Sequence, residues 1–240
     1  MTLLADFGNT RVKVAVRNGE SLTEIYCGPA GLHELQDAVK GIAVDGGMWC
    51  TVHELDKDLE NWLFSLGMSP LKWDTPTPVR NAYSTPRTLG MDRLAAAVGA
   101  WSLGKGQNIL VIDAGTAITV DLVTADGVYQ GGNIAPGIEM RLRALHDYTG
   151  SLPLVQAQGN IPWLGADTDT AIRSGVVNGV KKELKGYIQE ANQRYGSVLV
   201  FLTGGDAESF DLIDKNANFV AHNLVIRGLS CIMDYNENKI

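Results

Sequence analysis

The sequence predicts an α/β protein made of two related halves, and three observations lead to this. Apolar segments of strand length alternate along the chain with segments of helical apolar spacing. A strand, an Asp-x-Gly turn and a second strand occur twice, once near residue 6 and again near residue 113. With 240 residues and 45% hydrophobic content, the chain can bury one large core or two smaller ones, and the repeat favours two. We place the halves at residues 1–103 and 104–240.

The first half opens with the first copy of the repeat. Apolar residues 3–5 lead into an Asp-Phe-Gly-Asn-Thr turn, and residues 12–16 then alternate in the way that is typical of a half-buried strand. The following residues predict helices over 32–42 and 55–66 and short strands over 48–52 and 71–73. Thr-Pro-Thr-Pro at 75–78 predicts an extended connector. A helix over 89–101, entered through Gly90, is expected to bridge the halves.

The second half opens with the second copy, Leu-Val-Ile-Asp-Ala-Gly-Thr at 110–116, in which the turn is one residue tighter. A strand over 118–122 follows. Residues 131–137 predict a strand and a turn that opens a helix through Leu145, and 168–191 predict a long helix. A buried strand over 198–202 then ends in Thr-Gly-Gly-Asp at 203–206, and a helix over 223–235 follows it. Each half is therefore expected to be a sheet backed by helices.

Composition narrows the choice of partners and compartment. A net charge of -7 and a pI near 5.1 oppose the basic surface that nucleic-acid binding requires, so we expect small-molecule partners and no nucleic acid. The apolar N-terminal run is interrupted by Asp6 and has no basic leader, which predicts neither a signal peptide nor a membrane span. Cys27, Cys50 and Cys231 have no Cys-x-x-Cys spacing. We expect reduced, buried cysteines in a cytoplasmic protein.

The repeated turn has the features of a site for nucleotide phosphates. Gly8 would let a phosphate approach the backbone, Asn9 and Thr10 could donate hydrogen bonds, and Lys13 adds positive charge. Asp6 would orient Mg²⁺, directly or through water, because this ion keeps several waters and takes one or two carboxylates. A single turn of this kind is usually an ordinary hairpin. Two copies could hold a triphosphate from both sides, which is the stabilisation that phosphoryl transfer needs.

The Thr203-Gly204-Gly205-Asp206 segment supports the same interpretation. Its glycines would let an adenosine lie against the backbone, and the following helix would offer free amides, although an ordinary strand-to-helix turn has the same appearance. Gly-x-x-x-x-Gly-Lys-Ser/Thr and Gly-x-Gly-x-x-Gly loops, the marks of two other nucleotide folds, are absent. Together the three motifs predict a kinase that binds ATP and phosphorylates a small hydroxylated substrate.

This order of motifs resembles the superfamily of acetate and sugar kinases, Hsp70 and actin. The resemblance implies duplicated ribonuclease-H-like (actin-like ATPase) domains, each a mixed sheet flanked by helices. More narrowly, the chain is similar to type III pantothenate kinases over nearly its whole length. The blocks that carry the similarity are 6–13, 83–93, 112–117, 131–137, 152–155 and 168–175.

The resemblance implies ATP-dependent phosphorylation of pantothenate to 4'-phosphopantothenate, the first step of coenzyme A biosynthesis. The enzyme would be a transferase (ATP:pantothenate 4'-phosphotransferase) that binds ATP, Mg²⁺ and a monovalent cation, K⁺ or NH₄⁺. Asp92 would be the catalytic base, and its carboxylate is chemically suited to take the proton of the primary hydroxyl. Asp113 would bind the monovalent cation.

The resemblance also assigns the binding residues. ATP would be bound by Asp6, Phe7, Gly8, Asn9, Thr10, Arg11, Val12, Lys13 and Thr116. Pantothenate would be bound by Tyr83, Gly90, Met91, Asp92, Arg93 and Thr168. Thr168 would reach it across the interface of a homodimer with a shared active site.

Some alternatives remain open at this point. Arg93 could pair with the carboxylate of the substrate or with a structural carboxylate, and Tyr83 could be an ordinary half-buried aromatic residue. The chain could be another small-molecule kinase of the superfamily, since the nucleotide motifs define the cofactor better than the acceptor. It could also be a non-catalytic transcriptional accessory protein, but the intact Asp6, Asp92 and Asp113 argue against that function.

Overall fold

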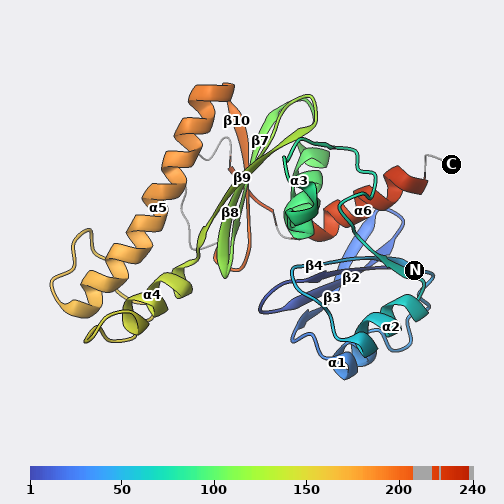
Figure 1. Cartoon of the computed structure of the whole chain (residues 1–240), viewed down its shortest axis with the longest axis horizontal. Helices are drawn as coiled ribbons and strands as arrows, with labels where there is room; N and C mark the ends of the chain where they lie inside the picture. The colour runs from blue at the N-terminus through green and yellow to red at the C-terminus, as the bar shows by residue number, and fades with distance from the viewer. Residues whose placement is uncertain (208–217, 222, 238–240) are drawn as a thin grey trace. The chain divides into compact units, whose positions relative to one another are not determined.

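The computed structural model describes residues 1–207, 218–221 and 223–237. By their internal contacts, the residues form two compact units (Figure 1). The first unit contains Met1–Gly106, Val123–Gly131 and Asn223–Ile240, and the second contains Gln107–Leu122 and Gly132–His222. The helix that follows residue 223 therefore groups with the first unit, although it comes last in the chain. The boundary of the repeat at residues 103 and 104 stays a prediction.

The first unit is built on a five-stranded mixed sheet. Its order is β3(Ser21–Gly28), β2(Val12–Asn18), β1(Thr2–Phe7), β4(Gly47–Thr51), β5(Met68–Pro70). The first three strands are antiparallel, whereas β4 and β5 run parallel to β1. The strands expected at 3–5, 12–16 and 48–52 are confirmed, and β3 was not foreseen. The strand expected at 71–73 is wrong: Gly67, at φ +74°, turns the chain early, and Pro70 is tolerated because β5 is an edge strand.

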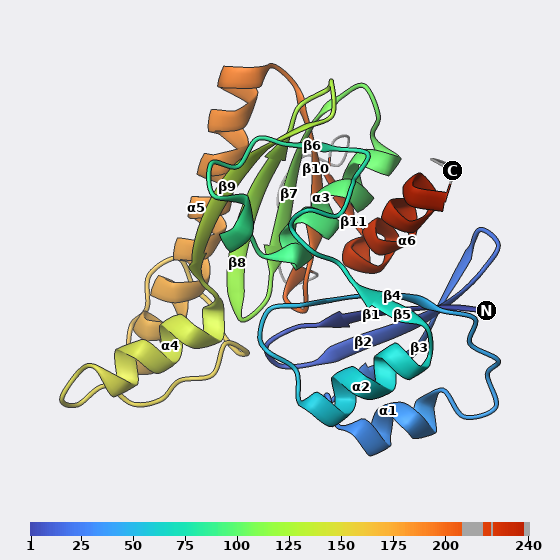
Figure 2. The same cartoon turned by 45° about the vertical axis from the view of Figure 1, so that its right-hand side comes forward.

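Helices cover both faces of this sheet (Figure 2). The helices α1(Leu32–Ala38) and α2(Lys57–Ser65) pack on the face that carries Leu3, Ala5 and Phe7. The alternation of a strand sends Leu4 and Asp6 to the opposite face, where α3(Met91–Leu103) and α6(Leu224–Glu237) pack against β1 and β4. The predicted helices are confirmed, although the first ends at Ala38 and not at Ile42. Asp6 and the helix that carries Asp92 are thus on one face.

The connection into α3 is extended, as the prolines predicted. Residues 75–78 lie in no helix or strand, and β6(Arg80–Asn81) then pairs with the start of β9(Val128–Pro136). A short 3-10 turn at Pro86–Thr88 precedes α3. Inside the unit, α3 and α6 pack closely because both helices have a glycine at the contact, Gly99 and Gly228.

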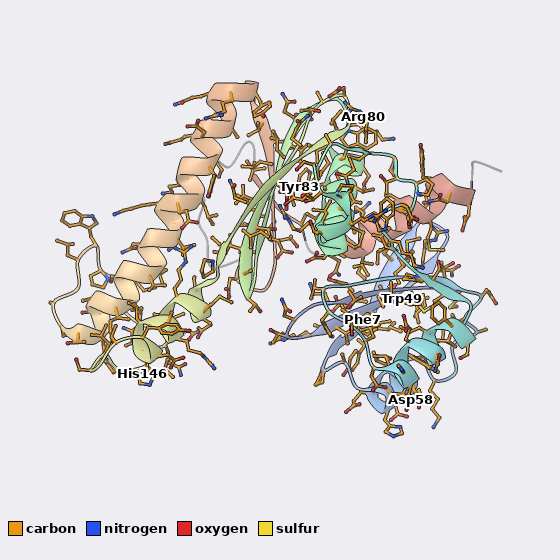
Figure 3. All side chains as sticks on the ribbon, viewed as in Figure 1. Phe7, Trp49, Asp58, Arg80, Tyr83 and His146 are labelled. Atoms are coloured by element: carbon orange, nitrogen blue, oxygen red, sulfur yellow. The ribbon has the colours of Figure 1, made fainter. Side chains whose placement is uncertain are left out.

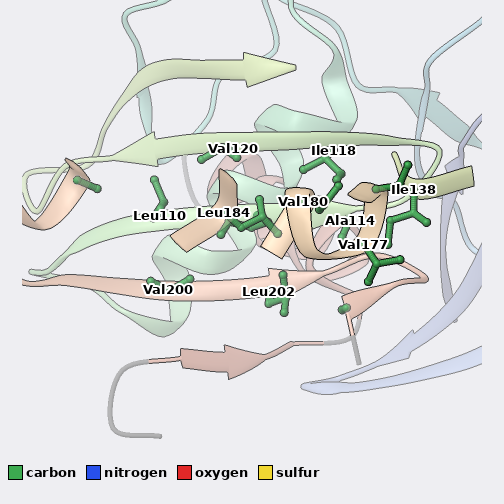
Figure 4. Packing of buried hydrophobic residues seen from close by; sticks show 14 of the residues in the cluster. Leu110, Ala114, Ile118, Val120, Ile138, Val177, Val180, Leu184, Val200 and Leu202 are labelled. Atoms are coloured by element: carbon green, nitrogen blue, oxygen red, sulfur yellow. The ribbon is translucent and has the colours of Figure 1, made fainter. Parts of the chain in front are cut away.

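The second unit contains the larger part of a six-stranded sheet. The order is β11(Asn218–Val220), β10(Val198–Thr203), β7(Asn108–Ala114), β8(Ala117–Val123), β9, β6. The helices α4(Ile138–Asp147) and α5(Thr168–Tyr195) cover one face of it. Figure 4 shows Val177, Val180 and Leu184 of α5 packed against side chains from β7, β8 and β10. The strands over 118–122 and 198–202 and the helices through Leu145 and over 168–191 are confirmed, whereas the helix expected directly after the Thr-Gly-Gly-Asp turn lies outside the described residues.

The cysteines differ in their surroundings. All three are free; Cys50 is buried, Cys231 is half-buried and Cys27 is exposed. The expectation of a buried residue is therefore wrong for Cys27, which lies on β3 at the edge of the sheet. In the part of the chain that the structure describes, no helix combines the length and apolar character needed to cross a membrane.

Candidate active site

The first hairpin holds its predicted turn in place through the backbone. The amide of Gly8 donates to the carbonyl oxygen of Arg11 at 3.1 Å, and a Cβ on Gly8 would lie 3.2 Å from that oxygen. Asn9, Thr10 and Arg11 are exposed at the tip. These residues are therefore accessible to a ligand, as the prediction of a phosphate site requires.

Two of the residues expected to bind ATP turn their side chains away from the tip. Phe7 and Val12 are fully buried in the core that also contains Trp49, and Figure 3 labels Phe7 and Trp49 in this unit. Only the backbone of these two residues can contribute to a binding site. Asp6 and Lys13 are half-buried, and they lie opposite each other in the antiparallel register of β1 and β2.

Asp6 has a second neighbour at the same level of the sheet, on the other side. Cys50 of β4 is its partner in the parallel register, so the side chains of Lys13, Asp6 and Cys50 form a row on one face. The thiol of Cys50 donates a weak hydrogen bond to Oδ1 of Asp6 at 3.6 Å. This is the face against which α3 packs.

Cys50 is influenced by two carboxylates that the sequence assigned to the site, Asp6 as the Mg²⁺ ligand and Asp92 as the catalytic base. Its pKa is raised well above the usual 9.0, first by burial, then by the negative charges of Asp6 and Asp92. The geometry agrees, since Asp6 contacts the sulfur atom and α3, whose second residue is Asp92, packs against β4. Eighty-five residues lie between these two aspartates in the chain, and the fold brings them to the same face of the sheet.

The start of α3 presents Asp92 and Arg93 in different ways. Gly90 is the N-cap residue, and Oδ1 of Asp92 lies over it so closely that a Cβ on Gly90 would be 2.5 Å from that oxygen. Asp92 and Met91 are half-buried, whereas Arg93 is only 6% exposed. The guanidinium carbon of Arg93 lies 5.9 Å from the centre of the Tyr83 ring, within range of a cation–π interaction.

Tyr83 is held by a glycine that sequence analysis did not assign to the site. Its ring packs on Gly131 of β9, where a Cβ would be 3.1 and 3.3 Å from two ring carbons. Gly131 also has φ +104°, a backbone conformation that other residues rarely adopt. The Tyr129 ring lies 6.3 Å from the Tyr83 ring, and Figure 3 labels Tyr83. The Gly131-Gly132 pair was visible in the sequence, but its role depends on this distant contact.

The second hairpin repeats the geometry of the first with one residue fewer. The amide of Gly115 donates to the carbonyl oxygen of Ala117 at 3.1 Å, which confirms the tighter turn. Thr116 is exposed at the tip, and its carbonyl oxygen accepts a hydrogen bond from Gly137, the N-cap residue of α4, at 3.0 Å. Asp113 is half-buried and level with Thr203 of the parallel strand β10.

The Thr-Gly-Gly-Asp segment folds over the end of β7. Gly204 has φ +96°, and a Cβ there would be 2.3 Å from the carbonyl oxygen of Ala114 and 2.5 Å from Oδ1 of Asp113. The amide of Asp206 donates to the same carbonyl oxygen at 2.9 Å. Burial raises the pKa of Asp206 above its usual value of 3.8. The glycine turn and the second hairpin are therefore parts of one local structure.

Thr168 is the first residue of α5, and its side chain is exposed. The preceding residue, Asp167, caps the helix by accepting a hydrogen bond from the Thr170 amide at 2.8 Å. This hydrogen bond, and a second one from the Thr170 hydroxyl, hold the pKa of Asp167 below its usual value, and the backbone amide has the larger effect. Thr168 belongs to the second unit, whereas Tyr83 and the 90–93 segment belong to the first.

Among the described residues, no cluster of three or more His, Cys, Asp or Glu side chains could hold a metal ion by itself. Asp6 and Asp113 are each a single carboxylate at the end of a strand. Such a carboxylate fits Mg²⁺ or a monovalent cation that completes its coordination with water and phosphate oxygens.

Two mixed sheets flanked by helices, each with an Asp-x-Gly hairpin, define a protein of the actin-like ATPase and sugar-kinase fold. A Listeria monocytogenes protein described as an N-acetylmannosamine kinase superimposes with a TM-score of 0.53 at 14% identity, over 100% of both chains. A Campylobacter jejuni protein of the Baf family, described as a transcriptional activator, gives a TM-score of 0.64 at 20% identity, over 98% of this chain and 99% of that one. At these identities the likeness concerns the fold alone.

The sequence relatives define the family. The profile of the type III pantothenate kinases matches residues 2–190. A type III pantothenate kinase of Bacteroides fragilis is 45% identical over 244 residues, which covers 100% of both proteins, and one of Phocaeicola vulgatus is 43% identical over 240 residues, 99% of each. The chain belongs to the type III pantothenate kinase family, and the resemblance stated from its motifs is confirmed.

Proposed function

We propose that this chain is a pantothenate kinase that transfers the γ-phosphoryl group of ATP to the primary hydroxyl of pantothenate. The product is 4'-phosphopantothenate, and the reaction is the first step of coenzyme A biosynthesis. The observation that carries the proposal is that Asp6 and α3, the helix that carries Asp92 at its start, lie on the same face of the first unit's sheet. One carboxylate for Mg²⁺ and another for the substrate hydroxyl are what phosphoryl transfer requires close together.

Asp92 is proposed to act as the general base. It is half-buried at the start of α3, and the bare Cα of Gly90 beside it leaves its carboxylate unobstructed by a side chain at that position. A carboxylate within hydrogen-bond reach of the hydroxyl can take its proton as the phosphoryl group arrives. Most of the remaining catalysis in this reaction class is positioning and charge stabilisation.

Tyr83, Gly90, Met91, Arg93 and Thr168 are proposed to bind pantothenate with Asp92. Arg93 could pair its guanidinium with the carboxylate of pantothenate, and its place beside the Tyr83 ring supports this. Its burial is also compatible with a structural partner. The pantothenate KM and the melting temperature of Arg93→Lys separate the two roles. Loss of a substrate contact would raise the KM, whereas loss of a structural contact would lower the melting temperature.

The two hairpins are proposed to bind ATP. Residues Asp6–Lys13 would contribute the exposed tip and Thr116 its hydroxyl. Asp6 would hold Mg²⁺, directly or through water, and Asp113 would hold K⁺ or NH₄⁺. When bound, these cations would neutralise charge that develops on the phosphate oxygens. The positions of both carboxylates at strand ends, next to turns rich in backbone amides, support the assignment.

The decisive experiment is an ADP-release assay with Mg²⁺ and K⁺ that compares pantothenate with sugars, acetate and glycerol, with mass detection of the product. Pantothenate-dependent ADP and a phosphopantothenate mass would establish reaction and acceptor. Turnover with another acceptor alone would point to another kinase of the superfamily. Lack of turnover with every acceptor would favour a non-catalytic transcriptional accessory protein.

A homodimer with a shared active site is the second part of the proposal. In the second unit, α4 and α5 border a groove of about 600 Å³ lined largely by apolar residues such as Leu145, Ile172 and Val176. Tyr148 lies at this groove and is 88% exposed, which is unusual for so large an aromatic side chain. A second copy that covers the groove would bury these side chains.

Light scattering at micromolar concentration tests the dimer. Tyr148→Glu is expected to give a monomer of low activity. Tyr195→Glu, at the end of α5 that lies away from the groove, is expected to stay dimeric. A monomeric protein with full activity would rule out the shared site.

The free cysteines and the use of ATP support a cytoplasmic location.

A further inference from the structure

Cys50 occupies a position that neither the motifs nor the proposed roles explain. It lies on β4, is only 1% exposed and is level with Asp6 of the neighbouring parallel strand. The preceding residue, Trp49, points into the core between the sheet and the helices α1 and α2. Because side chains alternate along a strand, Cys50 points to the opposite face, on which α3 packs. The thiol therefore lies on the same side of the sheet as both site carboxylates.

The contacts of this thiol are specific. Sγ donates to Oδ1 of Asp6 at 3.6 Å, which fits a hydrogen bond from sulfur. The face on which this thiol lies is covered by α3, which carries Asp92 at its start. The thiol therefore places a hydrogen-bond donor beside the carboxylate of Asp6.

The second unit contains the same arrangement. There, Asp113 is the penultimate residue of β7 and is level with Thr203 on the parallel neighbour β10, as Asp6, the penultimate residue of β1, is level with Cys50 on β4. Cys50 and Thr203 are both small, buried residues that carry a hydrogen-bond donor. A small donor opposite the aspartate thus occurs in both copies of the repeat, which an arbitrary core residue would not explain.

We propose that Cys50 is a positioning residue of the phosphoryl-transfer site, whose thiol orients the carboxylate of Asp6. The inference rests on the role proposed for Asp6. Cys50 touches neither ATP nor pantothenate in this proposal; it acts through Asp6. Loss of the donor should therefore affect the use of Mg²⁺ more than the binding of pantothenate.

Cys50→Val and Cys50→Ser separate orientation from packing. Valine has a similar volume and no donor, whereas serine keeps a donor on a smaller side chain. Loss of one hydrogen bond predicts that Cys50→Val raises the Mg²⁺ concentration for half-maximal rate about 2–10-fold and lowers kcat, with the pantothenate KM within about twofold of wild type. Cys50→Ser should recover most of the Mg²⁺ response.

The experiment measures initial rates against Mg²⁺ and against pantothenate for both variants, with melting temperatures. Cys231→Val and Cys231→Ser serve as controls, because Cys231 is a half-buried free cysteine on α6 and belongs to neither β1 nor β4. If Cys50→Val does not fold, Cys50→Ala replaces it. An unchanged Mg²⁺ response in the valine or alanine variant, or a serine variant as impaired as these, would overturn the proposal.

Asp6→Asn distinguishes failure of this inference from failure of the site. If Asp6→Asn leaves the Mg²⁺ response unchanged, the role proposed for Asp6 is wrong and the inference falls with it. If Asp6→Asn weakens the Mg²⁺ response and Cys50→Val does not, only the inference about Cys50 is wrong. A lower melting temperature with an unchanged Mg²⁺ response would assign Cys50 a purely structural role.

Discussion

Gly204 crosses the end of β7 directly over the carboxylate of Asp113. A Cβ at Gly204 would lie 2.5 Å from Oδ1 of Asp113 and 2.3 Å from the carbonyl oxygen of Ala114, and the residue has φ +96°. The glycine is therefore required twice, once for the backbone conformation and once for space. The proposed cation ligand and the proposed adenosine turn depend on each other.

Gly204→Ala is expected to destabilise the protein by at least about 1–2 kcal/mol, from the backbone conformation alone. The displaced turn should also raise the KM for ATP, since Asp113 would have to move. Gly205→Ala is the matched control, because the next residue is exposed and a Cβ there would meet nothing within 4 Å. Urea denaturation and ATP titration measure both effects. Equal behaviour of the two variants would contradict this explanation.

Asp92→Asn should keep the fold and pantothenate binding but lose turnover, because the shape remains while the basicity is lost. A general base contributes about 10²–10⁴-fold to the rate, so kcat should fall within that range. Rapid-quench kinetics and pantothenate binding by calorimetry separate the two quantities. Turnover close to that of wild type would reject Asp92 as the base.

Asp58→Asn is the control for the loss of a negative charge near a helix start. Like Asp92, Asp58 is the second residue of its helix, and α2 also belongs to the first unit. Asp58 is exposed and is labelled in Figure 3. Asp58→Asn should have nearly wild-type kcat. A comparable loss of kcat in Asp58→Asn and Asp92→Asn would mean that helix stability, and not proton transfer, explains the effect.

Much of the fold follows from local pattern. Both hairpins and the glycine turn were predictable, because a turn needs particular residues at adjacent positions. Cys50 was not assigned to the site, since its importance comes from the register of β4 against β1, strands that are forty residues apart in the chain. The contact of Tyr83 with Gly131 is likewise invisible in the sequence, where nearly fifty residues separate them. Edge strand β5 was misplaced because its residues have no alternating pattern.

Gly131→Ala should impair pantothenate use through Tyr83. The new methyl group would lie 3.1 Å from the ring, at a residue with φ +104°, so the ring must move. A displaced contact residue can cost a large factor in rate, and we expect the pantothenate KM to rise about 10-fold or more with a smaller change for ATP. Gly150→Ala, which has open space around it, is the control. An unchanged pantothenate KM would argue against Tyr83 as a substrate contact.

The same substitution should have opposite effects on two helices. On α6, a Cβ at Gly228 would lie only 1.8 Å from the carbonyl oxygen of Ala95, so Gly228→Ala must push α6 away from α3. Overpacking of this kind costs about 1–3 kcal/mol or more.

On α5, Gly186 is exposed and a Cβ there would meet nothing within 4 Å. Gly186→Ala should therefore stabilise the protein by up to about 1 kcal/mol, the difference in helix propensity. Because α3 also carries Asp92, Gly228→Ala should lower kcat as well as the urea midpoint, whereas Gly186→Ala should change the midpoint alone. Destabilisation by both variants would mean that helix spacing is not what fixes α3.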